Sequence, residues 1–468
     1  MLRTHTCGEV NEKLSGKNVT LAGWVDSLRI MSNMIFIDLR DRYGFVQCII
    51  KKNHKDFEVA KKLTKESCVK IKGKVKKRLK ANSNKSSGKI EIEMTDLKIL
   101  SLSDKLPFDP KNVTEDIRLK YRYLDLRINP KLRKNIELRH NVIKFIRDYL
   151  DKEKFLEIQT PLLTKSSPEG ARDFIVPSRI HPGSFYALPQ SPQQYKQLLM
   201  VAGMDKYFQI APCLRDEDPR ADRSPGEFYQ LDLEMSFVEQ EDILNLIEKM
   251  LIKMVKTLLP DKKLTFEKIP RLSYEKCMKK YKTDKPDLRK NKKDKNELAF
   301  AWIVDFPLFE PELKEGCYAP MHHMFTMPKE SDLKLLNKKD AGKVKSYQHD
   351  LVLNGFEVGG GSIRVHNPEI QKKIFELIGF DEDDKKYFEH MLTAFKYGVP
   401  PHGGIAPGID RLLMVLLGED SLREVIAFPK NKEAKDVMMG APSFVKDIQL
   451  KEAHIKLDLP KKKVKKGK

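Results

Sequence analysis

A charged loop between two strand-like stretches is the strongest indication of chemistry in this chain of 468 residues. An apolar strand is expected to end at Pro212, the charged loop 215–223 follows, and strand-like alternation returns over residues 228–235. A solvated hairpin tip is the usual explanation of such a loop. Here, however, the polar alternates of the second strand fall on one face, because side chains alternate across a strand; they are Gln230, Asp232 and Glu234. That face predicts the floor of a polar pocket, with Arg215 and Glu217 at its rim.

Two further segments supply groups that would complete a site for a nucleoside triphosphate. Asp350 and Glu357 are expected on turns that flank a strand, and two carboxylates suit a hard cation such as magnesium. Three glycines after Glu357 are expected to break the strand and let a ligand approach the backbone, although such a run alone usually marks a flexible loop. Arg411 lies in the first turn of an apolar helix, where the backbone dipole also favours anions. With Arg215 and Phe228, these segments offer guanidinium groups for phosphates, carboxylates for a metal and an aromatic face for a base.

Composition is compatible with this prediction without deciding it. The net charge of +21 suggests a polyanionic partner, but the 88 basic residues are 67 Lys and 21 Arg, and such a lysine excess can reflect compositional drift. The six cysteines are scattered without a C-x-x-C pair, which predicts reduced thiols, no zinc site and a cytoplasmic protein. The N-terminus lacks the apolar region of a signal peptide, and no apolar run is long enough for a membrane span, so no membrane partner is expected.

Residues 1–102 have the strand pattern of a small barrel. A helical stretch over 56–65 interrupts five short alternating strands, which are predicted at 21–25, 34–39, 45–50, 69–75 and 90–94. This pattern predicts an OB-fold, a barrel that binds single-stranded nucleic acid by stacking bases on aromatic side chains. Phe36 and Gln47 fall on adjacent strands, Arg29 in the loop before them, and Glu91 on the last strand. From spacing alone, Phe36 is as consistent with core packing as with stacking.

The three charged segments resemble motifs 2 and 3, and the metal-binding strand between them, of class II aminoacyl-tRNA synthetases. Among these the chain is similar to the aspartate-specific enzymes of bacteria, in order from Met1 to about Ser443. Motif 1 is placed on a predicted helix over 131–152 and the following residues 155–161. The resemblance implies an α+β protein, in which an N-terminal OB-fold β-barrel precedes a catalytic domain built on an antiparallel sheet flanked by helices. It also implies a homodimer.

The resemblance divides the chain into an anticodon-binding barrel (1–102), a hinge (103–130), a catalytic domain (131–444) and a C-terminal segment (445–468) with a basic tail. A disordered, solvated end is the preferred interpretation of that tail over a role in holding tRNA. Bacterial relatives usually carry an additional domain, which a short crossover over 290–298 is expected to replace here. A second departure is Ser224-Pro-Gly226, where many relatives have a Gln-Pro pair near the ATP.

The activity implied is the ATP-dependent attachment of L-aspartate to tRNA(Asp) through an aspartyl-adenylate. ATP is then a substrate, Mg²⁺ is held by Asp350 and Glu357, and no protein nucleophile is needed, because Arg215 and Arg411 neutralise the reacting phosphates. The nucleotide residues carried over are Arg215, Asp216, Glu217, Phe228, Glu357, Gly408, Ile409, Asp410 and Arg411. The anticodon residues are Arg29, Phe36, Gln47 and Glu91, of which the aromatic ring stacks and the amide and carboxylate bind base edges.

Amino-acid choice is expected to depend on two cations. Lys196 and Arg364 match family positions that hold the side-chain carboxylate of aspartate, and a neutral amide would leave both cations unpaired. The aspartate residues carried over are Glu169, Ser191, Gln193, Lys196, Arg215, Asp232, His322 and Arg364; the neighbouring His323 is an alternative to His322. Three alternatives stay open: an enzyme that also charges tRNA(Asn), an asparagine-specific sister, and a paralogue that binds RNA or amino acid without aminoacylation.

Overall fold

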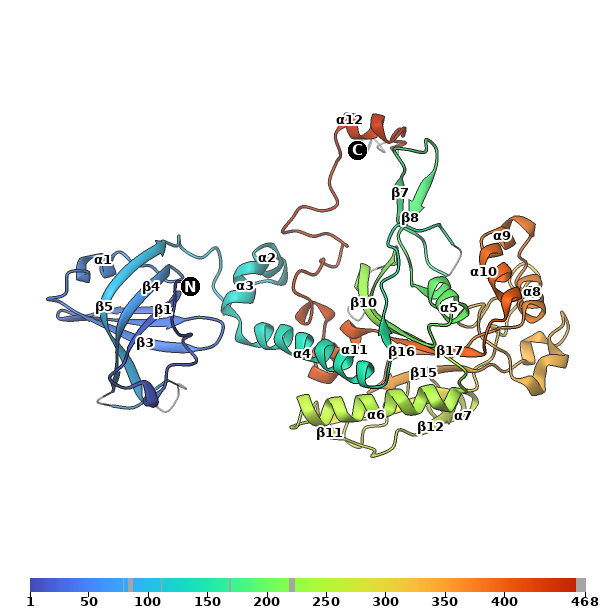
Figure 1. Cartoon of the computed structure of the whole chain (residues 1–468), viewed down its shortest axis with the longest axis horizontal. Helices are drawn as coiled ribbons and strands as arrows, with labels where there is room; N and C mark the ends of the chain where they lie inside the picture. The colour runs from blue at the N-terminus through green and yellow to red at the C-terminus, as the bar shows by residue number, and fades with distance from the viewer. Residues whose placement is uncertain (79, 83–86, 111, 168–169, 219–223, 460–468) are drawn as a thin grey trace, which may run out of the picture. The chain divides into compact units, whose positions relative to one another are not determined.

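The computed structural model describes residues 1–78, 80–82, 87–110, 112–167, 170–218 and 224–459. Two compact units divide the chain, Met1–Ile117 and Arg118–Lys468 (Figure 1). Glu169 and the basic tail from residue 460 lie outside the described residues. Within the described ranges, no helix has both the length and the apolar content needed to cross a membrane.

The first unit is a closed five-stranded barrel, as predicted. Its strands are β1 (Asn18–Ile30), β2 (Met34–Arg40), β3 (Phe45–Lys51), β4 (Cys68–Lys77) and β5 (Ile90–Ser101), in the order β1-β2-β3-β5-β4, with α1 (Phe57–Lys61) and a short η1 (Glu12–Leu14). The alternate residues Leu21, Ile35 and Ile37 fill the barrel because one face of each strand is buried. β1 continues well past its apolar alternation by pairing with β2, so Arg29 lies within a strand opposite Phe36 and not in a loop.

The second unit is built on an eight-stranded sheet in the order β12-β14-β15-β16-β17-β10-β9-β6. Its neighbours are antiparallel except for two parallel edge pairs, β12/β14 and β6/β9. The strands are β6 (Leu156–Glu157), β9 (Lys206–Arg215), β10 (Gly226–Ser236), β12 (Arg271–Ser273), β14 (Phe300–Val304), β15 (Gln348–Leu353), β16 (Phe356–Ile363) and β17 (His402–Pro407). Two small ladders join β7 (Ile175–Pro177) to β8 (Phe185–Ala187) and β11 (Lys263–Leu264) to β13 (Glu297–Leu298).

The two faces of β10 receive different helices. Leu231, Leu233 and Met235 point into the main apolar core, which they share with α4 (Pro130–Lys152), α6 (Gln240–Leu258) and α11 (Ile409–Leu417). The intervening polar residues face α5 (Gln193–Val201) and the site described below. The remaining helices are α2 (Glu115–Lys120), α3 (Arg122–Ile128), α7 (Tyr274–Tyr281), α8 (Pro368–Leu377), α9 (Glu382–Lys386), α10 (Glu389–Ala394) and α12 (Asp447–Glu452), with short η2 (Glu330–Leu335), η3 (Ala341–Lys343), η4 (Phe395–Tyr397) and η5 (Leu422–Glu424).

Two predicted chain breaks are absent. β9 runs through Pro212, which pairs with Tyr229; because β6 pairs only with Tyr207 and Phe208, Pro212 lies where the strand has an open edge and proline is tolerated. Likewise, the glycine run continues β16 and does not end it, so Asp350 and Glu357 lie on paired strands and not on turns. Gly359 and Gly361 are required because β17 approaches closely: a Cβ at Gly361 would overlap the Gly404 carbonyl oxygen.

Candidate active site

A cavity of about 400 Å³ opens between the polar face of β10, the glycine run of β16 and the first turn of α11. It gathers residues from all three charged segments that the sequence analysis singled out. The predicted site residues that line it are Ser191, Gln193, Lys196, Arg215, Glu217, Phe228, Asp232, His322, Glu357, Arg364, Gly408, Asp410 and Arg411. Ser224, next to the site of the missing Gln-Pro pair, lines it as well.

Two cations and two carboxylates form a buried cluster on one wall. The four side chains are at most 2% exposed. Lys196 Nζ lies 3.0 Å from Asp232 Oδ2 and 3.4 Å from Glu234 Oε2, and the Arg364 guanidinium donates to both Glu234 oxygens at 2.9 and 3.1 Å. Burial acts to raise the pKa of Glu234, but Arg364 and Lys196 outweigh it and lower that pKa below its usual range. Glu234 is therefore ionised, and the formal charges of the two cations and two carboxylates balance.

Asp232 differs from Glu234 in one respect that bears on ligand binding. Burial raises the pKa of Asp232 despite the opposing effect of Lys196. Its Oδ1 atom is buried and accepts no hydrogen bond within the described ranges. Buried acceptors are rarely left without a donor in native proteins, so this oxygen fits a cationic group supplied by a ligand.

The histidine pair is divided between two partners. Arg364 Nη1 donates to His323 Nε2 at 2.8 Å, and burial together with Arg364 holds the pKa of His323 well below its usual value, so this imidazole is neutral. His322 Nε2 instead lies 3.0 Å from Asp350 Oδ2. Burial lowers the pKa of His322, but Asp350 more than compensates and the net pKa is raised. His323 is thus the histidine that contacts Arg364, one of the two cations predicted to bind the aspartate side chain. The sequence analysis had put His322 first.

The two predicted phosphate-binding arginines are held by backbone carbonyls. Arg215 Nε donates to the Gln190 carbonyl at 3.1 Å, and its guanidinium lies 5.1 Å from the centre of the Phe228 ring, a distance suited to a cation–π contact. Arg411 Nη1 donates to the Glu357 carbonyl at 2.9 Å. Such contacts orient a guanidinium without neutralising its charge.

The side chains of three other predicted nucleotide residues make contacts within the protein or lie outside the cavity lining. Asp410 accepts from Arg139 and, at 2.9 Å, from the Tyr229 amide, so it ties α11 to α4 and β10. Ile409 is fully buried in the apolar core. Asp216 is exposed, 3.6 Å from Arg172, and does not line the cavity.

The two predicted metal carboxylates are placed differently with respect to the cavity. Glu357 lines it and is 2.9 Å from Lys285 Nζ; burial acts to raise the pKa of Glu357, but Lys285 and Arg411 lower it overall. Asp350 is only 2% exposed and lies behind Gly360, with Gln348 Nε2 at 2.8 Å from its Oδ1 atom and His322 on its Oδ2 atom. Burial raises the pKa of Asp350.

Gln348 and Lys285 were not assigned from sequence, Glu234 was placed on the pocket floor without a role, and His323 was named only as the alternative to His322. Glu234 had a local signal, since it alternates with Asp232 on the predicted polar face. Lys285 had none, because it is one lysine among 67. Its role follows only from the fold, which brings residue 285 beside β16.

The barrel carries a second candidate site on its outer face. Phe36 is half-buried and points away from the core residues Ile35 and Ile37. The Arg29 guanidinium lies 5.6 Å from the Phe36 ring centre and donates to Gln47 Oε1 at 3.2 Å; Gln47 Nε2 in turn donates to Glu91 at 3.1 Å. The four predicted residues therefore form one connected polar and aromatic surface.

Comparison with known proteins matches both units of the chain to described families. Residues 114–432 match the family of class II tRNA synthetases (D, K and N), and residues 19–100 match the OB-fold nucleic acid binding domain. The chain belongs to the class II tRNA synthetases and is therefore an enzyme of that family. It is similar to proteins named aspartate–tRNA(Asp/Asn) ligase from Pelagibacter ubique (41% identity, covering 98% of this chain and 99% of the relative) and Thermoanaerobacter sp. (42%, 98% and 98%).

Solved structures show the same fold at low sequence identity. An asparaginyl-tRNA synthetase from Pyrococcus horikoshii superposes with a TM-score of 0.74 at 24% identity, covering 92% of this chain and 98% of that one. An aspartyl-tRNA synthetase from Entamoeba histolytica gives 0.71 at 23% identity, covering 91% of each. The alignment with the Pelagibacter relative spans 594 positions, more than the 468 residues present here, so that relative carries segments without a counterpart in this chain.

Proposed function

We propose that this enzyme attaches L-aspartate to tRNA(Asp) at the expense of ATP, through an aspartyl-adenylate. The observation that carries the proposal is the buried cluster with one unsatisfied carboxylate oxygen on Asp232. The substrate ammonium would bind that oxygen, and the side-chain carboxylate would bind Lys196 and Arg364, since a ligand with both charges keeps the cluster balanced. Asparagine would bring the ammonium without the second anion and would leave a desolvated positive charge.

Activation needs positioning and charge neutralisation, and no protein nucleophile. An oxygen of the aspartate α-carboxylate attacks the ATP α-phosphorus in line. The new O–P bond forms as the bond from the α-phosphorus to the α,β-bridging oxygen breaks, and pyrophosphate leaves with that oxygen. Arg215 lies at the motif 2 end of the cavity and Arg411 at the α11 end, where they bind the phosphates. Phe228 offers its ring to the adenine, and Glu217 a carboxylate acceptor on the same wall.

A magnesium ion fits the donor set on β15 and β16. Magnesium is usually bound by one or two carboxylates together with substrate phosphates and waters. The chain offers that number: Glu357 at the cavity and Asp350 behind it. The described ranges hold no group of three or more acidic, histidine or cysteine side chains that could bind a metal ion. Bound there, the ion would neutralise phosphate charge. Lys285, now paired with Glu357, and His322, now paired with Asp350, would give up those contacts.

Transfer to tRNA follows at the same cavity. The terminal ribose hydroxyl of tRNA attacks the activated carbonyl and AMP leaves, while the barrel surface of Arg29, Phe36, Gln47 and Glu91 reads the anticodon. Use of tRNA(Asn) as a second substrate is a specific alternative, because the similar relatives carry the name aspartate–tRNA(Asp/Asn) ligase.

We propose a homodimer that pairs through the motif 1 region. Leu156, Leu162 and Leu163 follow α4 and are each about half exposed, which leaves an apolar surface for a second copy.

The crossover 290–298 would stand where relatives carry their additional domain. Within it, the Glu297 carboxylate accepts hydrogen bonds from the backbone amides of Lys290 and Asn291, both at 2.9 Å.

Pyrophosphate exchange into ATP tests the proposal directly. We expect exchange that depends on aspartate and not on asparagine, followed by charging of a tRNA(Asp) transcript. Charging a tRNA(Asn) transcript in parallel decides the tRNA range. Exchange driven by asparagine alone, or no exchange with either amino acid, would overturn the proposed activity.

A further inference from the structure

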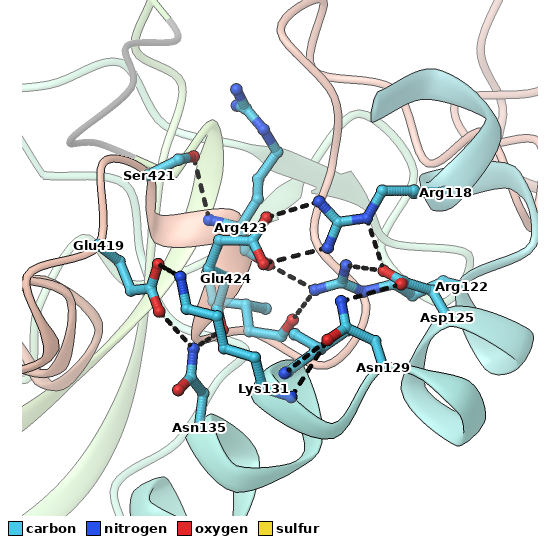
Figure 2. A network of polar contacts seen from close by, with 12 residues as sticks. Arg118, Arg122, Asp125, Asn129, Lys131, Asn135, Glu419, Ser421, Arg423 and Glu424 are labelled. Carbon is cyan, nitrogen blue, oxygen red and sulfur yellow. Dashed lines mark hydrogen bonds and ion pairs between the residues drawn. The ribbon is translucent and has the colours of Figure 1, made fainter. Parts of the chain in front are cut away.

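The segment that follows α11 connects the nucleotide half of the cavity to the helices at the start of the second unit. Residues 419–427 leave the end of α11, and Leu422 of this segment lines the cavity. Figure 2 shows the polar network that holds the segment: side chains from α2, α3 and the first turns of α4 converge on its backbone and on Glu419 and Glu424. Apart from the Arg139–Asp410 contact given above, the residues that hold this segment were not among the assigned site residues.

Arg122 binds several carbonyl groups of this segment at once. Its side chain is 2% exposed; Nε donates to the Ala427 carbonyl at 2.9 Å, and Nη2 donates to the Ile426 carbonyl at 2.9 Å and to that of Arg423. Nη1 is held 3.0 Å from Asp125 Oδ2. A planar guanidinium can satisfy carbonyls in this fixed arrangement, whereas a lysine ammonium is a point charge on a flexible stem.

Arg118 binds the same segment through Glu424. Its guanidinium donates to both Glu424 oxygens at 2.9 and 3.1 Å, and its Nε donates to Asp125 at 3.0 Å. Burial acts to raise the pKa of Glu424, but Arg118 outweighs it and lowers that pKa, so Glu424 is ionised at neutral pH. Asp125 therefore orients both arginines.

Helix α4 extends the grip to the first turn of α11. Asn135 donates to the Glu424 carbonyl at 3.0 Å, and Arg139 donates to the Val425 carbonyl at 3.3 Å and to Asp410. Asp410 precedes Arg411 and accepts from the Tyr229 amide on β10. Helix α4 thus contacts the segment after α11 and the turn that carries Arg411. Asp410 connects that turn to β10.

We propose that Arg118 and Arg122 are positioning residues for the nucleotide half of the active site, acting through residues 423–427 on Leu422 and α11. The inference rests on the proposed use of ATP at this cavity. It assigns a role in nucleotide binding to a stretch that the family resemblance treated as a hinge. Without these hydrogen bonds and ion pairs, the α11 end of the cavity can shift. Small displacements of binding groups have large kinetic effects.

The test compares Arg122→Lys and Glu424→Gln with a matched control. Arg271→Gln breaks another partly buried arginine pair of the same unit, in which Arg271 binds Glu248 and, at 2.6 Å, the Ile269 carbonyl, away from the cavity. The measurements on the full chain are thermal unfolding, ATP binding by equilibrium dialysis, and the KM values for ATP and aspartate in pyrophosphate exchange.

We expect both variants to raise the KM and the dissociation constant for ATP by about tenfold and to leave the KM for aspartate unchanged. Arg271→Gln should lower the unfolding temperature without changing the KM for ATP. Parallel loss of ATP and aspartate binding, no change in ATP binding, or an equal ATP effect in the control would overturn the proposal. If Arg122→Lys does not fold, Glu424→Gln decides alone. Absence of exchange in the wild type would contradict the proposed function, while dialysis would still compare ATP binding among the variants.

Discussion

Replacing Lys196 by methionine should affect folding as well as substrate use, and the two effects can be separated. Lys196 pairs with the fully buried carboxylate of Asp232 and supports Glu234. Removing one partner of a buried ion pair costs about 3–5 kcal/mol, because the other charge is stranded. Since Glu234 keeps Arg364, we expect the lower end, about 3 kcal/mol in the free energy of unfolding at pH 7.

The deficit should depend on pH in a defined direction. Burial already raises the pKa of Asp232, and loss of Lys196 raises it further. The folded state then binds a proton more readily than the unfolded chain, so the stability of Lys196→Met rises as the pH falls through the folded-state pKa. The difference from wild type is therefore largest at neutral pH and shrinks toward pH 5.

A second substitution distinguishes a structural cation from a substrate-binding one. In Lys196→Met/Asp232→Asn both charges are gone, and most of the unfolding free energy should return. The catalytic efficiency for aspartate in pyrophosphate exchange should fall about a hundredfold in Lys196→Met, equivalent to about 3 kcal/mol, with ATP binding unchanged. It should be at least as low in the double variant, because Asp232 is the proposed partner of the substrate ammonium. Urea unfolding at pH 5 and pH 7 supplies the stabilities. If aspartate use returns together with stability, or if ATP affinity falls equally, Lys196 does not bind the substrate carboxylate.

The remaining predictions concern the barrel, the metal carboxylates and the crossover. Phe36→Ala and Gln47→Ala should each slow tRNA charging by about 1–3 kcal/mol and leave aspartate-dependent exchange intact; parallel losses would make both residues structural. Glu357→Gln should raise the Mg²⁺ concentration needed for half-maximal exchange more than Asp350→Asn does, because both Asp350 oxygens already accept hydrogen bonds, and the reverse order would place the ion on Asp350. A Gly/Ser replacement of 290–296, whose side chains are mostly exposed, should change the unfolding free energy by under about 0.5 kcal/mol; a large loss of exchange would show that the segment orders the site.

Elements with one buried face were predictable from sequence, and charge partners were not. The barrel strands and α4 follow from local alternation and helical periodicity, both of which are recorded in consecutive residues. The polar face of β10 was visible for the same reason, but its cations come from α5 and β16, which only the assembled sheet brings together.

The stretch around Arg122 shows the same limit more sharply. The sequence analysis assigned this charged stretch to a hinge, yet Arg122 and Asp125 are buried and bind each other. Arg118 finds Glu424 at a sequence separation of 306 residues. From sequence alone a charged side chain is predicted to lie on the surface, because its distant partner is not known. The Glu357–Lys285 contact was missed for the same reason.

The main apolar cores of the two units have no residue in common: one fills the barrel with residues such as Leu21 and Ile37, and the other joins β10 to α4, α6 and α11. We expect each core to unfold cooperatively by itself, so calorimetry should resolve two endotherms. A single unfolding temperature would then not describe the whole chain. Substitutions at Lys196 or Arg122 should shift only the endotherm of the larger unit. Substitutions at Phe36 or Gln47 should shift only the endotherm of the barrel. Each endotherm thus serves as the internal reference for changes made in the opposite half of the molecule.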